Sequence, residues 1–286
     1  MLIFKRIGLA LAFSPTAESM LAEAAKLKRL FSAELVLIHV GSHGAREDEL
    51  LKSLLAKTGL THDDIRMVWQ NGDPATEIMT VCRKENIDLL VAGALKTENL
   101  VKYYIGTIAR KIMRKSSCSL MMIVNPSVSP ASIKNIVVNA EDSPWVKKAL
   151  TIACRIAELQ ENAWLHIVRE LKLYGLAMSA AHQHSEDEYT QLQQHLLQDE
   201  IEQVEKMLAA IPHHNTKVNI KMLSGKSGFE LCKFADRKQA DLLIVGAPTR
   251  RFSVLDRMFP HDLEYVFADL PCNLLIVHPG KEDSRA

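Results

Sequence analysis

The stretch Asp88-Leu-Leu-Val-Ala-Gly93 returns later in the chain as Asp241-Leu-Leu-Ile-Val-Gly246, at an offset of 153 positions. Each copy places an acidic residue before a short aliphatic run and a glycine after it, a pattern that predicts a buried strand followed by a turn. Repetition of such a unit at a long period indicates a duplicated domain. The sequence therefore predicts two α/β domains of the same kind.

Further matches extend the repeat in both directions. Gly72 and Gly225 share the offset of 153, and the Cys118 and Cys272 segments match at an offset of 154. Residues 4–7 match 133–136 at an offset of 129, and 37–40 match 165–167 at an offset of 127. The offset rises from 127 to 153 between these matches, so the second copy has about 26 extra residues. They fall within the stretch around 171–210, whose Gln-, Glu- and Leu-rich composition is typical of one or two helices. We expect domains at 1–127 and 132–280, joined by the Pro- and Ser-rich segment 125–131.

Within each copy, aliphatic runs alternate with segments of helical period. Residues 36–40, 89–92 and 120–124 predict strands, whereas 17–31 and 108–114 predict helices. This βαβ order predicts a parallel sheet with helices on both faces. Ligands of such sheets bind beyond the carboxyl ends of the strands, so functional residues are expected there.

The composition narrows the class of protein. The chain has 35 basic and 34 acidic side chains, 48% hydrophobic residues and 24% charged residues, which excludes a disordered or collagen-like chain. The near-zero net charge gives no electrostatic footprint for nucleic acid. No segment has the roughly 20 apolar residues of a membrane span, and the apolar stretch 7–13 is better explained as a buried first strand than as a signal peptide. Five scattered cysteines argue against a disulfide framework and favour a reducing cytoplasm.

The loop after the strand at 89–92 carries the strongest candidate site. Gly93 ends the strand, and Gly106-Thr107 opens a helix, whose start offers unpaired N–H donors to an anion. Lys96, Lys102 and Arg110 supply nearby positive charge. These residues suit a phosphate cradle, although the same glycines are also explained by a strand exit and a helix start alone.

Several of these motifs, in this order, resemble the universal stress protein family. They are Gly72-Asp-Pro-Ala-Thr-Glu77, Asp88–Gly93, Gly106-Thr107-Ile-Ala and the cysteine before the last strand, and the second copy repeats the later ones. The resemblance covers nearly all of the chain and implies two tandem five-stranded parallel-sheet domains, of the Rossmann-like, adenine-nucleotide α-hydrolase-like type, that form a pseudo-dimer. It also implies pairing of the last strands, 120–124 against 274–277, and allows a further homodimer.

The resemblance also assigns a nucleotide site, because many members of the family bind ATP through Gly-x-x-Gly, nine residues, and Gly-Ser or Gly-Thr. In the first copy Gly93, Gly106 and Thr107 match, Lys96 replaces the second glycine, and Ala12 replaces the acidic residue after the first strand. The position that lines the adenine pocket falls on Val40, and the sequence neighbours Ala92 and Ile108 complete the expected site. The second copy keeps Glu141 and Gly246, has Thr249 at the second glycine, and has Phe259-Pro260 where Gly-Ser or Gly-Thr is expected. We therefore expect the second site to be degenerate.

These features lead to three functional hypotheses. The first is a cytoplasmic, non-enzymatic stress-response protein that binds ATP or another adenine nucleotide, with or without Mg²⁺, in its first domain. The alternative is a ligand-free structural or interaction module in which both sites have lost nucleotide binding. A nucleotide-hydrolysing enzyme is the third, and the sequence offers it no dedicated acid–base pair. The histidine clusters at 182–184 and 213–214 lack partners at metal-ligand spacing, so no metal site is predicted.

Overall fold

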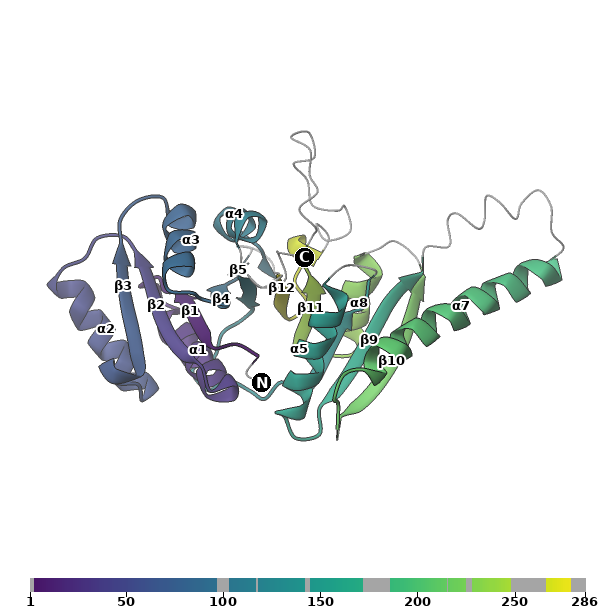
Figure 1. The fold of residues 1–286 in the computed structure, drawn as a ribbon. Coiled ribbons are helices and arrows are strands. Elements are labelled where there is room, and N and C mark those ends of the chain that lie inside the picture. Colours follow the sequence, from purple (N-terminus) through teal and green to yellow (C-terminus); the bar gives the residue numbers. More distant parts are fainter. Residues whose placement is uncertain are drawn as a thin grey trace. The chain divides into compact units, whose positions relative to one another are not determined.

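The computed structural model describes residues 3–96, 103–116, 118–141, 145–171, 186–214, 216–224, 228–247 and 266–278. Its contacts divide the chain into two compact units. Unit 1 comprises residues 1–132 together with 267–286, and unit 2 comprises residues 133–266. Figure 1 shows strands and helices alternating along the chain, as the sequence predicts for an α/β fold.

Unit 1 contains the whole first repeat. Its elements are β1 (Arg6–Ala10), α1 (Ala17–Phe31), β2 (Glu34–Val40), α2 (Ala45–Thr58), the 3₁₀ helix η1 (His62–Asp64), β3 (Ile65–Gln70), α3 (Pro74–Lys84), β4 (Leu89–Gly93), β5 (Leu95–Lys96), β6 (Tyr103–Tyr104), α4 (Thr107–Lys115), β7 (Ser119–Ile123) and β12 (Asn273–Val277).

The sheet of unit 1 has the strand order β3-β2-β1-β4-β7-β12. The first five strands are parallel, whereas β12 runs antiparallel to β7 with Leu275 opposite Met121. The predicted pairing of 120–124 with 274–277 is therefore confirmed. Although β12 is the last strand of the second sequence repeat, its contacts place it in unit 1.

Helices cover both faces of this sheet. A Cβ on Gly93 would lie 3.4 Å from the Met20 sulfur of α1, whereas a Cβ on Gly8, on the opposite face, would lie 2.7 Å from Cδ1 of Ile87, just after α3. Helices α1 and α2 pack together, as do α3 and α4. Every side chain of the run Leu89–Val91 is fully buried, as expected for a strand covered on both sides. Burial of each such side chain stabilises the unit by about 1.5–3 kcal/mol relative to exposure.

Unit 2 repeats the pattern with four parallel strands in the order β10-β9-β8-β11. Its elements are β8 (Asn135–Asn139), α5 (Val146–Glu158), β9 (Trp164–Leu171), α7 (Glu186–Ala209), β10 (Lys217–Ser224), α8 (Phe229–Arg237) and β11 (Leu242–Gly246). Helix α7 lies in the long segment that the repeat offsets predict; it takes the place of α2 between the second and third strands and has 24 residues against 14. The strand β9 extends to Leu171, so the extra residues follow this strand.

An aspartate ties the amino ends of the strands together in each unit. The carboxylate of Asp88 accepts the backbone N–H of Lys5 at 2.7 Å and that of Arg6 at 3.2 Å. In unit 2, Asp241 accepts the N–H groups of Lys134 and Asn135 at 2.7 and 2.8 Å. The repeated aspartate therefore aligns the strand that follows it with the first strand of the same repeat.

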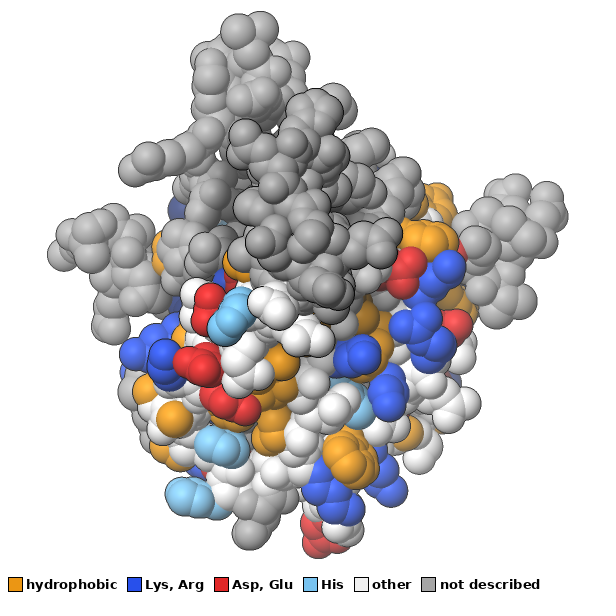
Figure 2. Space-filling view, turned by 90° about the vertical axis from the view of Figure 1, so that its right-hand side faces the viewer, with side chains coloured by type: hydrophobic (Ala, Val, Ile, Leu, Met, Phe, Trp, Pro, Cys, Tyr) orange, Lys and Arg blue, Asp and Glu red, His pale blue; other side chains and the backbone are white. Residues whose placement is uncertain are grey.

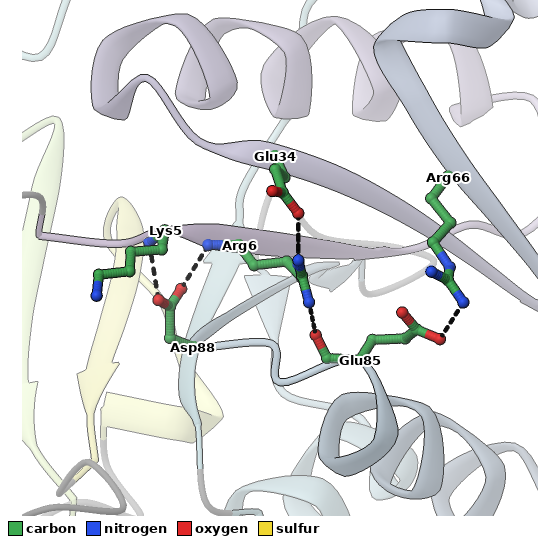
Figure 3. A network of polar contacts seen from close by, with 6 residues as sticks. All are labelled: Lys5, Arg6, Glu34, Arg66, Glu85 and Asp88. Atoms are coloured by element: carbon green, nitrogen blue, oxygen red, sulfur yellow. Dashed lines mark hydrogen bonds and ion pairs between the residues drawn. The ribbon is translucent and has the colours of Figure 1, made fainter.

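In unit 1 this edge carries further ion pairs (Figure 3). The guanidinium of Arg6 donates to the Glu34 carboxylate and to the Glu85 carbonyl oxygen, both at 2.6 Å. The Glu85 carboxylate pairs with Arg66 at 2.9 Å. The polar network holds the amino ends of β1, β2, β3 and β4 in register, and leaves the opposite, carboxyl edge for function.

Candidate functional site

The carboxyl edge of unit 1 gathers most of the residues that the sequence predicts for a nucleotide site. Val40 ends β2, and Ala92 and Gly93 end β4. Val40 and Ala92 are half-buried, Gly93 is exposed, and Ala12 is exposed just after β1. Because β1, β2 and β4 are parallel neighbours, these residues share one edge of the sheet.

Helix α4 begins close to this edge. Gly106 is its N-cap, with extended backbone and no side-chain cap, and the first turn holds no acidic residue. Thr107 and Ile108 are exposed, so the N–H groups of the first turn lie at the surface without a capping side chain. Such a helix start attracts an anion through its unpaired donors and through the helix dipole.

The cations near α4, which are the predicted Lys96 and Arg110 and also Lys111, have different surroundings. The Arg110 guanidinium donates to the Ile105 carbonyl oxygen at 2.9 Å, and Lys111 pairs with the Asp73 carboxylate at 2.7 Å. Lys96 is exposed and lies opposite Tyr103 in the short β5–β6 hairpin. Lys102 lies outside the described residues. Among the residues described at this site, Lys96 is therefore the cation best placed to meet a ligand.

The hairpin also brings an apolar side chain to the start of α4. A Cβ on Gly106 would lie 2.6 Å from Cδ1 of Leu95, so the glycine provides the space in which this side chain lies. Leu95 is 50% exposed and has room to move. Among the described residues, Leu95 rather than Lys96 is the side chain that lies against Gly106.

An aromatic cluster that the sequence analysis missed lies at the ends of β1, β2 and β3. The Phe13 ring centroid is 4.8 Å from His39 and 6.0 Å from Trp69, and His43 stacks on Trp69 at 4.1 Å. Nδ1 of His39 lies 2.9 Å from the Leu11 carbonyl oxygen, which agrees with a hydrogen-bonded structural histidine. His39 and Trp69 are the penultimate residues of β2 and β3, whereas Phe13 lies three positions after the end of β1.

The predicted match of 37–40 with 165–167, which pairs His39 with His166, is wrong. The N–H of Leu11 donates to Ile38 in unit 1, and that of Ala140 donates to Val168 in unit 2, so the second strands align at an offset of 130 rather than 127. His39 therefore corresponds to Arg169, and His166 lies in the middle of β9. The three-residue error arose because short aliphatic runs align in several registers.

The carboxyl edge of unit 2 is more strongly internally paired. The buried Arg169 forms an ion pair with Glu200 of α7, and it donates to Gln203 at 3.0 Å. Glu170, at the position of Val40, accepts the N–H of Gly228 at 2.9 Å. Glu141 is half-exposed after β8, and Gly246 ends β11. Thr249, Phe259 and Pro260, as well as His182 and His184, lie outside the described residues.

Comparison with known proteins agrees with this architecture. The model of the universal stress protein family matches the chain twice, over residues 3–124 and 132–278. The chain belongs to the universal stress protein family. The tandem arrangement that the sequence repeat predicts is thereby confirmed.

Individual relatives add detail on the fold of this universal stress protein. A universal stress protein of Methanothermobacter thermautotrophicus is 31% identical over 84 residues, which are 27% of this chain and 55% of that protein, so the match spans about half of the relative. A solved universal stress protein from Archaeoglobus fulgidus has a TM-score of 0.68 at 15% identity, covering 96% of this chain and 98% of that one. A functionally unknown protein from Pseudomonas aeruginosa gives 0.68 at 14% identity, with 99% and 95% covered. At such identities these solved structures show a common fold.

Two further features bear on what this universal stress protein binds. Within the described ranges, His, Cys, Asp and Glu side chains nowhere gather in a group of three that could hold a metal ion. Among the helices that the structure describes, none combines the length and apolar character needed to cross a bilayer. Of the two histidine clusters in the sequence, the one at 213–214 lies in the turn that follows α7, where Nδ1 of His213 is 2.6 Å from the Ile211 carbonyl oxygen.

Proposed function

We propose that this universal stress protein is a cytoplasmic, non-enzymatic stress-response protein whose first unit binds ATP or another adenine nucleotide. The observation that carries the proposal is the start of α4, where Gly106 and Thr107 present an uncapped helix terminus beside the exposed Gly93. The first turn holds no carboxylate to repel a phosphate. The family resemblance adds that many members bind ATP through these same positions.

The residues present fit a nucleotide in two parts. The backbone N–H groups of Thr107 and Ile108, the Thr107 hydroxyl and the Lys96 ammonium group would hold phosphate oxygens. Val40 and Ala92 would line the base, which they contact without a polar anchor because Ala12 has no side-chain donor or acceptor. The nucleotide would bring its own Mg²⁺, since the metal is normally held by phosphate oxygens and water together with one or two carboxylates.

Calorimetric titration with ATP and Mg²⁺ tests the proposal. We expect saturable heat from the parent chain and none from Gly106→Arg, whose side chain would fill the start of α4. The matched control is Gly44→Arg, which places the same side chain at the exposed N-cap of α2 and should leave binding unchanged. Absence of heat from the parent at millimolar ATP would refute nucleotide binding.

The rival function is a ligand-free interaction module, and Leu95 is the observation in its favour. Its side chain lies against Gly106, where a ligand would approach. If Leu95 only shields an otherwise competent site, Leu95→Ala should strengthen ATP binding. A Leu95→Ala variant that remains silent in the titration, like a silent parent, would favour the ligand-free module.

The non-enzymatic part of the proposal has its own measurement. Hydrolysis needs a positioned water and a group that stabilises the transferring phosphoryl. The Asp73 carboxylate beside α4 is engaged by Lys111 and Thr76. We expect phosphate release from ATP and Mg²⁺ at the background rate. Release above background that Gly106→Arg abolishes would show an ATPase.

A further inference from the structure

Unit 2 carries a strip of lysines and exposed aromatic rings on the α8 face of its sheet. Lys217 of β10 lies opposite Trp164 of β9, and the two-residue period of the strand puts Lys221 on the same face. Trp164 is 42% exposed and Phe229 of α8 is 41% exposed. We call this surface the lysine strip, and its members are Trp164, Lys217, Lys221, Phe229, Lys233 and Lys238. Figure 2, the view from the side of β10, shows Lys and Arg side chains gathered with hydrophobic ones among them.

Aromatic rings hold three of these lysines in place. The Lys217 ammonium lies 5.7 Å from the Trp164 ring centroid, and Lys233 lies 4.2 Å from that of Phe229. Lys238 lies 5.9 Å from the ring of Phe234. Such contacts restrict the lysine side chains before a partner arrives, which lowers the entropy cost of binding.

The lysines of the strip lack a carboxylate partner within ion-pair distance in the part of the chain that the structure describes. There, Lys217, Lys221, Lys233 and Lys238 form no ion pair with a carboxylate. Exposed rings among unpaired ammonium groups make a surface that is positive and partly apolar. Its complement is an acidic segment that also offers aliphatic side chains.

Helix α7 has the complementary chemistry. Its 24 residues contain seven carboxylates and a single lysine. Asp199 and Glu205 are exposed, and Leu197 is 38% exposed. At 1.5 Å per residue the helix is about 36 Å long, whereas the eight residues of β10 span about 26 Å. Part of α7 therefore extends past its own sheet, as Figure 1 shows.

The lysine strip cannot be covered by α7 of its own chain. Val204 and Leu208 are buried, and Arg169, which pairs with α7, lies five positions from Trp164 along β9. An odd spacing on a strand means opposite faces, so α7 packs on the face that α8 and the strip do not share. The acidic helix and the lysine strip can meet only between two molecules.

We propose that the lysine strip binds helix α7 of a second copy of this chain. In a two-fold dimer the contact occurs twice, because each copy supplies one strip and one helix. The exposed carboxylates of α7 would pair with the ammonium groups of the strip. This interface is separate from the nucleotide site proposed for unit 1.

Sedimentation equilibrium of the full chain over a salt series tests the proposal. We expect twice the 32.0 kDa chain mass at low ionic strength and a shift toward 32.0 kDa at about 0.5 M NaCl, where charges are screened. Lys217→Glu/Lys221→Glu should weaken the dimer at least about tenfold. Lys52→Glu/Lys84→Glu, the same charge change on exposed residues of unit 1, should leave the dimer as it is.

A mixing experiment separates this contact from misfolding and from general charge effects. Asp199→Lys/Glu205→Lys should also weaken the dimer, because α7 then has five carboxylates instead of seven and places two new ammonium groups against the positive strip. Mixed with Lys217→Glu/Lys221→Glu, it should restore dimers, because in each contact of the mixed pair residues 199 and 205 then carry the charge opposite to that of residues 217 and 221. A monomeric parent at low salt, a dimer insensitive to the strip variant, or a mixture that stays monomeric would each overturn the proposal. If the parent is monomeric and binds a fluorescent single-stranded oligonucleotide that Lys217→Glu/Lys221→Glu does not bind, the ligand of the strip is nucleic acid instead.

Discussion

Replacing Gly8 by alanine should destabilise unit 1 by about 1–2 kcal/mol. Gly8 lies in the middle of β1, and the new Cβ would be 2.7 Å from Cδ1 and 3.2 Å from Cγ2 of the buried Ile87. Overpacking of this kind costs about 1–3 kcal/mol. The smaller conformational freedom of alanine in the unfolded chain offsets about 0.4–1 kcal/mol of that.

A double-mutant cycle with Ile87→Val locates the origin of the loss. Valine removes Cδ1, the atom in closest approach, at its own cost of about 0.5–1.5 kcal/mol. In the valine background Gly8→Ala should therefore cost less than about 0.5 kcal/mol, giving a coupling free energy of about 1 kcal/mol. If Gly8→Ala costs the same in both backgrounds, or stabilises the parent, the steric argument is wrong.

Urea unfolding followed by tryptophan fluorescence measures these differences in unit 1. The chain has three tryptophans, of which Trp69 belongs to unit 1 and Trp145 and Trp164 to unit 2. Replacing the latter two by phenylalanine leaves Trp69 as the sole reporter. All four members of the cycle should be compared in that background, so that unit 2 does not contribute to the signal.

Three further outcomes follow from the polar groups and thiols. Hydrogen bonds from Lys111 and from Thr76 lower the pKa of Asp73 to about 2, whereas the pKa of this carboxyl in the unfolded chain is about 3.9. The ionised carboxylate therefore stabilises the fold above about pH 4, and this stabilisation is lost as the pH falls toward 2. Asp73→Asn should accordingly lower the thermal midpoint at pH 6 and match the parent near pH 2 in melts followed by circular dichroism. Arg169→Met should lower the free energy of unfolding by about 3 kcal/mol, measured in urea, because it leaves Glu200 without its cation. Adding Glu200→Gln should recover most of this free energy. A urea midpoint that Arg169→Met leaves unchanged would contradict the pairing. Ellman's reagent should titrate one thiol quickly in the native protein, that of the half-exposed Cys232, and five in denaturant; several fast thiols would show that the four buried cysteines are accessible.

Strands and helices were the most predictable part of the fold. The helix predicted at 17–31 is α1 to the residue, and the aliphatic runs at 36–40 and 89–92 lie within β2 and β4. Periodicity identifies such elements because burial on one or both faces restricts which residues each position accepts. The repeated aspartates were also visible in the sequence, although their role at the amino edge depends on strands far apart along the chain.

The candidate site was less predictable because it depends on contacts between loops. The contact of Leu95 with Gly106 arises only when β5 pairs with β6, and no local pattern announces a two-residue strand. The spacing of glycines focused attention on Lys96 instead. In the same way, Phe13 and Trp69 are 56 positions apart, and only the order of β1, β2 and β3 in the sheet brings their rings together.

The pairing of β12 with β7 has a consequence for synthesis. About 150 residues separate β7 from the strand that covers its edge, so at about 5–20 residues per second the ribosome needs about 8–30 s to deliver β12. During that interval the nascent first half exposes a hydrogen-bonding edge that another unfinished chain can capture. A fragment that ends near residue 132 never receives β12, so its β7 edge stays unpaired. Such fragments should aggregate through this edge more readily than the full chain does.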